Sequence, residues 1–163
     1  MMKCAIPAVI SVLLCICLFS SGCLTYQTSE STQPPCGDQE PVVGTWIYDP
    51  GGLGDAVFLF IFKDSGRYDA AAIPRDDSKE LDYEVWITGS WTAAGIDNYN
   101  VAGQIISHDF RIDTREVSQH NENLTYDPLR DALFNREHPH GIFTRVSCDP
   151  QIPSTMKVSI PFD

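Results

Sequence analysis

Few side chains in this sequence of 163 residues have the types and spacing needed for metal binding or acid–base chemistry. The four histidines are His108, His120, His138 and His140. In the segment His138-Pro139-His140, strand alternation would place both imidazoles on one side, as a metal site requires. Because no third ligand can be named, and because Glu137 beside the pair suits a surface loop equally, we expect no metal centre here.

A second candidate is the acidic segment between residues 75 and 82. Its carboxylates are Asp76, Asp77, Glu80 and Asp82. Oxygen ligands of this kind suit a hard cation such as calcium, but the segment lacks the spacing and the glycine of an EF-hand loop. We therefore expect a solvated charged loop. The sequence has no Gly-x-Ser-x-Gly turn and no glycine-rich phosphate loop, so we predict a protein that is not an enzyme and holds no cofactor.

The first 23 residues have the pattern of an export signal. Met1-Met2-Lys3 is a short, positively charged start, and residues 4–19 are an uncharged apolar run. A helix of this length spans about 24 Å, which is less than the ~30 Å hydrocarbon core of a bilayer. The run therefore predicts an export signal rather than a mature membrane span. It ends in the small residues Ser20-Ser21-Gly22, followed by Cys23.

Small residues directly before a cysteine resemble the lipobox of prokaryotic lipoproteins. The resemblance implies that residues 1–22 are removed and that Cys23 is lipidated, which would anchor the protein on the outward face of the cell membrane. The alternatives are an ordinary cleaved secretory signal and an uncleaved anchor. The remainder of residues 23–41 is rich in Ser, Thr, Gln and Pro and is expected to form a flexible tether.

Two cysteines, Cys36 and Cys148, remain beyond the signal and Cys23. An exported protein with one pair of cysteines in an oxidising compartment is expected to form one disulfide. The two residues flank the region of expected strands, so a bond between them would bring the two ends of that region together. The alternative is a pair of free thiols.

From Val42 onwards the residues alternate with period two, interrupted by Gly, Asp and Asn, as is typical of antiparallel strands. We expect strands at 42–48, 56–62, 67–73, 82–92, 99–107, 109–114, 123–126, 132–135 and 142–147, with 156–162 as a further edge candidate. Residues 127–135 also fit a helical turn. The pattern predicts an all-β fold with little helix: an antiparallel up-and-down barrel, or a strongly curved sheet, of about eight strands in one domain of residues 42–163.

Two Gly-x-Trp segments, Gly44-Thr45-Trp46 and Gly89-Ser90-Trp91, lie on expected strands. The first resembles the Gly-x-Trp opening of lipocalins and other lipocalin-like small barrels. In that family the tryptophan closes one end of the barrel, and an arginine from a late strand packs across its ring. The resemblance implies that Trp46 and Arg145 meet at one end of the barrel, where a guanidinium over an indole gains cation–π energy.

Aromatic residues are numerous for a domain of this size. The candidates to line a ligand site are Phe58, Phe60, Phe62, Trp86 and Trp91. They either fill the core of a small barrel or line an apolar cavity or recognition patch. We favour core filling, because a small domain must bury most of its aromatic side chains to be stable.

The charge of the chain limits its partners. The sequence has 11 Lys and Arg against 22 Asp and Glu, a net charge of −11, which argues against nucleic acid. We expect a non-catalytic envelope lipoprotein whose barrel binds a small apolar ligand or a protein. The alternatives are a metal-dependent or hydrolytic enzyme, and an inhibitor whose acidic residues 75–84 enter a basic cleft. The sequon at Asn123 predicts that this residue is exposed.

Overall fold

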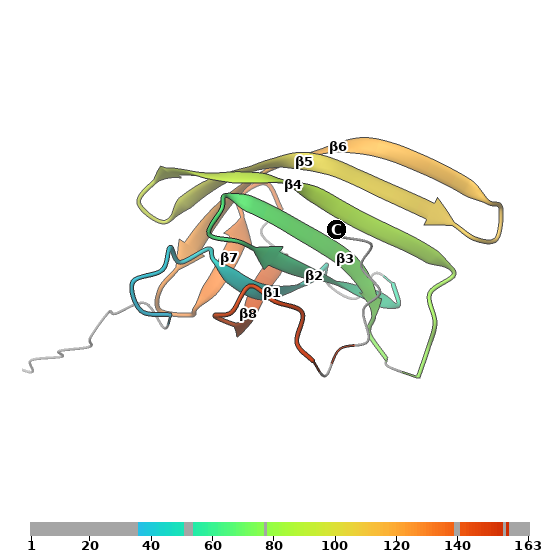
Figure 1. Ribbon diagram of the computed structural model, residues 1–163, viewed down its shortest axis with the longest axis horizontal. Coiled ribbons are helices and arrows are strands. Elements are labelled where there is room, and N and C mark those ends of the chain that lie inside the picture. Colours follow the sequence, from blue (N-terminus) through green and yellow to red (C-terminus); the bar gives the residue numbers. More distant parts are fainter. Residues whose placement is uncertain (1–35, 51–53, 77, 139–140, 155, 157–163) are drawn as a thin grey trace, which may run out of the picture. The chain divides into compact units, whose positions relative to one another are not determined.

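The chain folds into a closed antiparallel β-barrel. The computed structural model describes residues 36–50, 54–76, 78–138, 141–154 and 156. The eight strands are β1 (Gly44–Asp49), β2 (Ala56–Phe62), β3 (Arg67–Pro74), β4 (Tyr83–Gly95), β5 (Asn98–Asp109), β6 (Thr114–Asp127), β7 (Ala132–Asn135) and β8 (Ile142–Ser147). Each strand pairs with the next, and β1 pairs with β8, which confirms the predicted up-and-down barrel (Figure 1). None of the described residues forms a helix long and apolar enough to cross a membrane.

Two details of the strand prediction are corrected by the structure. The strand expected at 109–114 is wrong, because residues 110–113 form the turn between β5 and β6. β6 then runs from Thr114, and its first six residues are exposed and show no apolar alternation. Residues 127–135 form a turn and β7 rather than a helical turn. Most of the edge candidate at 156–162 lies outside the described residues.

The core lies inside the barrel, on alternate residues of each strand. On β2, Phe60 and Phe62 belong to the core cluster, whereas Leu59 and Ile61 are buried on the outer face of the same strand. The second half of β2, from Leu59 to Phe62, is thus buried on both faces. The segment after β8 crosses the neighbouring part of β1, where Thr45 Oγ1 lies 2.8 Å from the carbonyl oxygens of residues 149 and 151.

Three strands are much longer than the others. β4, β5 and β6 have 13, 12 and 14 residues, and they run side by side across the top of Figure 1. β7 pairs with β6 only from Leu124 to Asp127. Within the described residues, the part of β6 from 114 to 122 therefore pairs with β5 alone. Beside the first half of β6, the described residues therefore add no strand other than β5.

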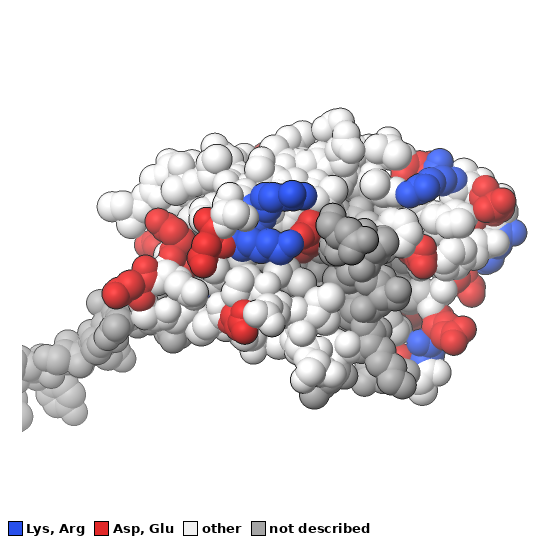
Figure 2. Space-filling model, in the orientation of Figure 1, with Lys and Arg blue, Asp and Glu red and all other residues white. Residues whose placement is uncertain are grey.

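The surface carries both signs of charge. On the face drawn in Figure 2, basic side chains lie among acidic ones rather than in a patch of one sign. Arg111 forms an exposed ion pair with Asp109 at 2.7 Å, whereas Lys63 pairs with the buried Asp69 at 2.6 Å. On the face drawn, the two signs of charge are thus interspersed.

Candidate functional site

One end of the barrel is sealed by Trp46 and Arg145. Pairing of β1 with β8 makes these two residues direct neighbours. The guanidinium carbon of Arg145 lies 3.9 Å from the centre of the Trp46 ring, which confirms the predicted contact. A Cβ atom at Gly44 would lie only 2.8 Å from Arg145 Nη1, so the glycine of the first Gly-x-Trp segment leaves room for the guanidinium. Trp46 is fully buried, and its Nε1 donates to the carbonyl of Val42 at 2.8 Å.

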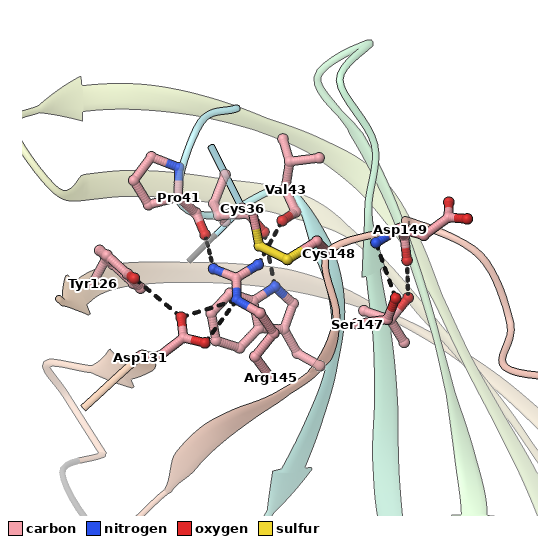
Figure 3. The surroundings of a disulfide bond; sticks show 12 residues. Cys36, Pro41, Val43, Tyr126, Asp131, Arg145, Ser147, Cys148 and Asp149 are labelled. Carbon is pink, nitrogen blue, oxygen red and sulfur yellow. Dashed lines mark hydrogen bonds and ion pairs between the residues drawn. A yellow bond between two sulfur atoms is a disulfide. The ribbon is translucent and has the colours of Figure 1, made fainter. Parts of the chain in front are cut away.

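The buried charge of Arg145 is fully compensated. Its Nε donates to Asp131 Oδ1 at 2.9 Å, its Nη1 to the carbonyl of Val43 at 2.7 Å and its Nη2 to the carbonyl of Pro41 at 2.5 Å (Figure 3). Asp131 also accepts a hydrogen bond from the Tyr126 hydroxyl at 3.0 Å. The side chain of Arg145 is only 6% exposed, so this network closes the end of the barrel against water.

The predicted disulfide between Cys36 and Cys148 is present beside this network, with 5.4 Å between the two Cα atoms (Figure 3). Residues 36–41, expected as the end of the tether, are fastened to the barrel by this bond and by the hydrogen bond from Arg145 to Pro41. The lipid attachment predicted at Cys23 lies outside the described residues, as do the signal and the rest of the tether through residue 35.

The opposite end of the barrel is different. There, the inner wall is formed by apolar side chains that pack against the core and remain partly exposed: Tyr48, Phe58, Val85 and Ile105. They lie at the end of β1, the start of β2, the start of β4 and towards the end of β5. Antiparallel pairing brings these positions to the end away from Trp46. The barrel therefore has one sealed end and one end where apolar wall reaches solvent.

A row of residues crosses the barrel between these two ends. Strand register aligns Phe62, Tyr68, Gly89, Gly103 and His120 on β2 to β6. A Cβ atom at either glycine would lie 2.7 Å from the Tyr68 side chain, so the tyrosine lies across both glycines. This lets the Tyr68 hydroxyl reach His120 Nδ1 at 2.6 Å. Gly89, in the second Gly-x-Trp segment, thus leaves room for a side chain from another strand, as Gly44 does in the first.

The row continues into a chain of hydrogen-bonding groups. His120 Nε2 lies 3.2 Å from Glu122 Oε1. Burial, together with the charges of Glu122 and Asp69, holds the pKa of Tyr68 far above its ordinary value. Tyr68 therefore keeps its hydroxyl proton, and the Tyr68 hydroxyl, the His120 ring and the Glu122 carboxylate lie in one row of hydrogen-bonding groups. Burial and the Glu122 charge also raise the pKa of Tyr48.

The structure separates the predicted ligand-lining residues into two groups. Phe58, Phe60, Phe62 and Trp91 face the interior, and the Trp91 indole donates to the carbonyl of Lys63 at 3.0 Å. Trp86 lies on the other face of β4 from the core residue Ile87 and does not line the interior. The grouping of Trp86 with the others is therefore corrected: alternation along β4 assigns Trp86 and Trp91 to opposite faces.

The other sequence candidates are spread over the surface. His108 pairs with Asp113 at 2.9 Å, His138 is exposed, and His140 lies outside the described residues. No group of three His, Cys, Asp or Glu side chains in the described part of the chain could hold a metal ion. In the acidic segment, Asp76 accepts hydrogen bonds from Ser78, which lower its pKa. Asn123 is exposed on β6, as its sequon predicts.

Tyr68, Glu122 and Asp131 were missed as site residues by sequence reasoning, and His120 was considered only as a metal ligand.

Comparison with known proteins finds no family model, no curated protein and no solved structure that matches this chain. What can be said of its architecture therefore comes from the chain itself. It is an eight-stranded antiparallel barrel with a buried aromatic cluster, sealed at one end.

Proposed function

We propose that this protein is a non-catalytic, lipocalin-like binding protein of the cell envelope, anchored to the membrane through lipid on Cys23. Its barrel takes a small apolar ligand through the end away from Trp46. The observation that carries this proposal is the contrast between the two ends: Arg145 seals one, while at the other Tyr48 and Phe58 are inner-wall residues that remain partly exposed. A ligand that covers this apolar wall removes it from water, and this burial favours binding.

The arrangement of the anchor supports the same proposal. The disulfide holds Cys36 at the sealed end, next to Cys148 at the end of β8. The tether would therefore join the barrel at the end that is already closed by side chains.

The test is a substitution that fills the open end. Ala72 faces the interior opposite Phe58, whereas its neighbour Ile73 lies on the outer face of β3. We expect Ala72→Trp to abolish binding of a neutral naphthalene probe by the full-length protein in lipid nanodiscs, and Ile73→Trp to leave it unchanged. Equal binding by the two variants would refute an internal site. Mass spectrometry of the extracted protein checks the anchor, since removal of residues 1–22 and lipid on Cys23 each change the mass.

A further inference from the structure

Glu122 is a carboxylate on the inner wall of the barrel. It pairs across β5 and β6 with Val101, a core residue, so the two side chains share the inward face. Its side chain is 24% exposed, in contrast to the 7% of its neighbour His120. Glu122 therefore reaches solvent from within an otherwise aromatic and aliphatic interior, beside the stretch where β6 pairs with β5 alone.

No Lys or Arg side chain of the described residues pairs with this carboxylate. The ion pair that Glu122 makes is with His120, at 3.2 Å. The other ring nitrogen of His120, Nδ1, lies 2.6 Å from the Tyr68 hydroxyl, so the imidazole is held between Tyr68 and Glu122. The cation that faces the interior, Arg145, is held by Asp131 at the sealed end. Glu122 is thus a carboxylate on the inner wall that has no Arg or Lys partner among the described residues and that solvent or a ligand can reach.

Aromatic rings face the same region. Phe60 lies 6.4 Å from the His120 ring and 5.0 Å from Phe143, and Phe143 lies 4.7 Å from Tyr48 (centroid distances). Glu122 lies 3.2 Å from the His120 ring, which contacts the Tyr68 hydroxyl at 2.6 Å, so the carboxylate is next to this group of rings. The faces of aromatic rings attract cations, and a carboxylate among them adds a direct ion pair.

We infer that the ligand of this barrel is a hydrophobic amine or another organic cation, with its positive charge at Glu122 and its apolar body against the aromatic wall. This inference rests on the proposed function and narrows its ligand class. The Tyr68–His120 pair is a positioning device: it fixes one oxygen of Glu122 and leaves the other for the ligand. Ligands with a carboxylate or phosphate group would be repelled by the same charge.

The inference is tested with three probes of one shape and different charge: 1-naphthylmethylamine, 1-naphthylmethanol and 1-naphthoate. Each is titrated by calorimetry at neutral pH into full-length protein in phosphatidylcholine nanodiscs, with empty nanodiscs as the blank. We expect the amine to bind about tenfold to a hundredfold more tightly than the alcohol, the range for a hydrogen bond to a charged group. The naphthoate is expected to bind most weakly.

Two variants locate the source of this preference. Glu122→Gln should reduce the affinity for the amine to that for the alcohol, and should leave the affinity for the alcohol unchanged. Glu116→Gln, three alternations earlier on the same face of β6 and exposed, should keep the preference. Equal losses in the two variants would show that the general acidity of the protein attracts the amine, and would overturn the inference.

The outcomes also separate the inference from the function on which it rests. Tight binding of the alcohol without any preference for the amine would refute the cation site and leave the apolar binding protein standing. Failure of both the amine and the alcohol to bind would refute the two together. A preference that persists in Glu122→Gln would assign the charge recognition to another residue and overturn the inference.

Discussion

The sealed end of the barrel and the row that crosses its middle are built in the same way and differ in how they treat charge. In each, the glycine of a Gly-x-Trp segment leaves space for a side chain from another strand. Gly44 makes room for Arg145, and Gly89 makes room for Tyr68. In both places a long side chain can lie across the inner wall only because a Cβ atom is missing beneath it.

The difference is in the partners at the far end of each side chain. Arg145 meets Asp131 and two backbone carbonyls, so its charge is compensated inside the protein. The row of hydrogen-bonding side chains that starts at Tyr68 and passes through His120 ends at Glu122. The Glu122 carboxylate has no Arg or Lys partner among the described residues and stays partly exposed. A compensated buried charge contributes to the fold, whereas a charge left open on an inner wall is available to a ligand.

The largest effect is expected at the sealed end. Arg145→Ala would leave the Asp131 carboxylate and the carbonyls of Pro41 and Val43 without their partner, and should lower the free energy of unfolding by about 3–5 kcal/mol. Arg145→Lys should recover only part, because an ammonium cannot stack and donate in three directions at once. Urea unfolding followed by tryptophan fluorescence measures both.

Arg136→Ala is the matched control for this loss. Arg136 is exposed, and its guanidinium donates to Thr125 and Asn98 on the rim, so we expect a change below about 1 kcal/mol. A loss in Arg145→Ala no larger than that in Arg136→Ala would mean that the seal adds nothing to stability.

An intermediate effect is expected in the middle row. A Cβ atom at Gly103 would lie 2.3 Å from the carbonyl oxygen of Thr88 and 2.7 Å from the Tyr68 hydroxyl. Gly103→Ala should therefore push the tyrosine away from His120 and destabilise the barrel by about 1–3 kcal/mol, the usual range for overpacking. Ser90→Ala, at an exposed position of β4, should change stability by less than about 0.5 kcal/mol in the same unfolding measurement. If both variants unfold like the wild type, the position of Tyr68 does not depend on the space that the glycines leave beneath its ring.

The smallest effect concerns the protonation of Tyr68. Its folded pKa is raised, so the stability that this adds is fully present below about pH 10, the unfolded tyrosine value, and is lost as pH rises towards the folded value. At pH 7, Tyr68→Phe should cost about 1 kcal/mol through the lost hydrogen bond to His120. Above pH 10 the wild type should lose stability faster than the variant, so the difference between their free energies of unfolding should become smaller. Parallel profiles in urea unfolding above pH 10 would contradict a protected phenol in the folded state.

Much of the sealed end could be predicted from the sequence. Trp46 belongs to a short motif, Arg145 is a charge in an otherwise alternating strand, and Cys36 and Cys148 are the cysteines left to pair. The carboxylate that completes the seal could not be found in this way. Asp131 lies in the turn before β7, with a positive φ of 46°, and nothing in a turn sequence indicates which charged side chain the turn will direct inwards.

The middle row was missed for a different reason. The segment 114–122 has few apolar residues, so its alternation could not be seen, and a strand was expected at 109–114 instead. His120 and Glu122 were therefore assigned to no face. Tyr68 and Gly89 were placed on strands correctly, but their meeting with His120 depends on the register of three consecutive strand pairs.

The sequence by itself thus determined the all-β class, most of the strands and the disulfide. These follow from period-two alternation, turn residues and the two cysteines left to pair. The contact of Trp46 with Arg145 was implied by the resemblance to lipocalin-like barrels. Only the tertiary structure decided which residues line the open half and that Glu122 stands there without an Arg or Lys partner among the described residues. Register is set by the packing of all the strands together, and a shift of one residue would move every side chain of a strand to the other face.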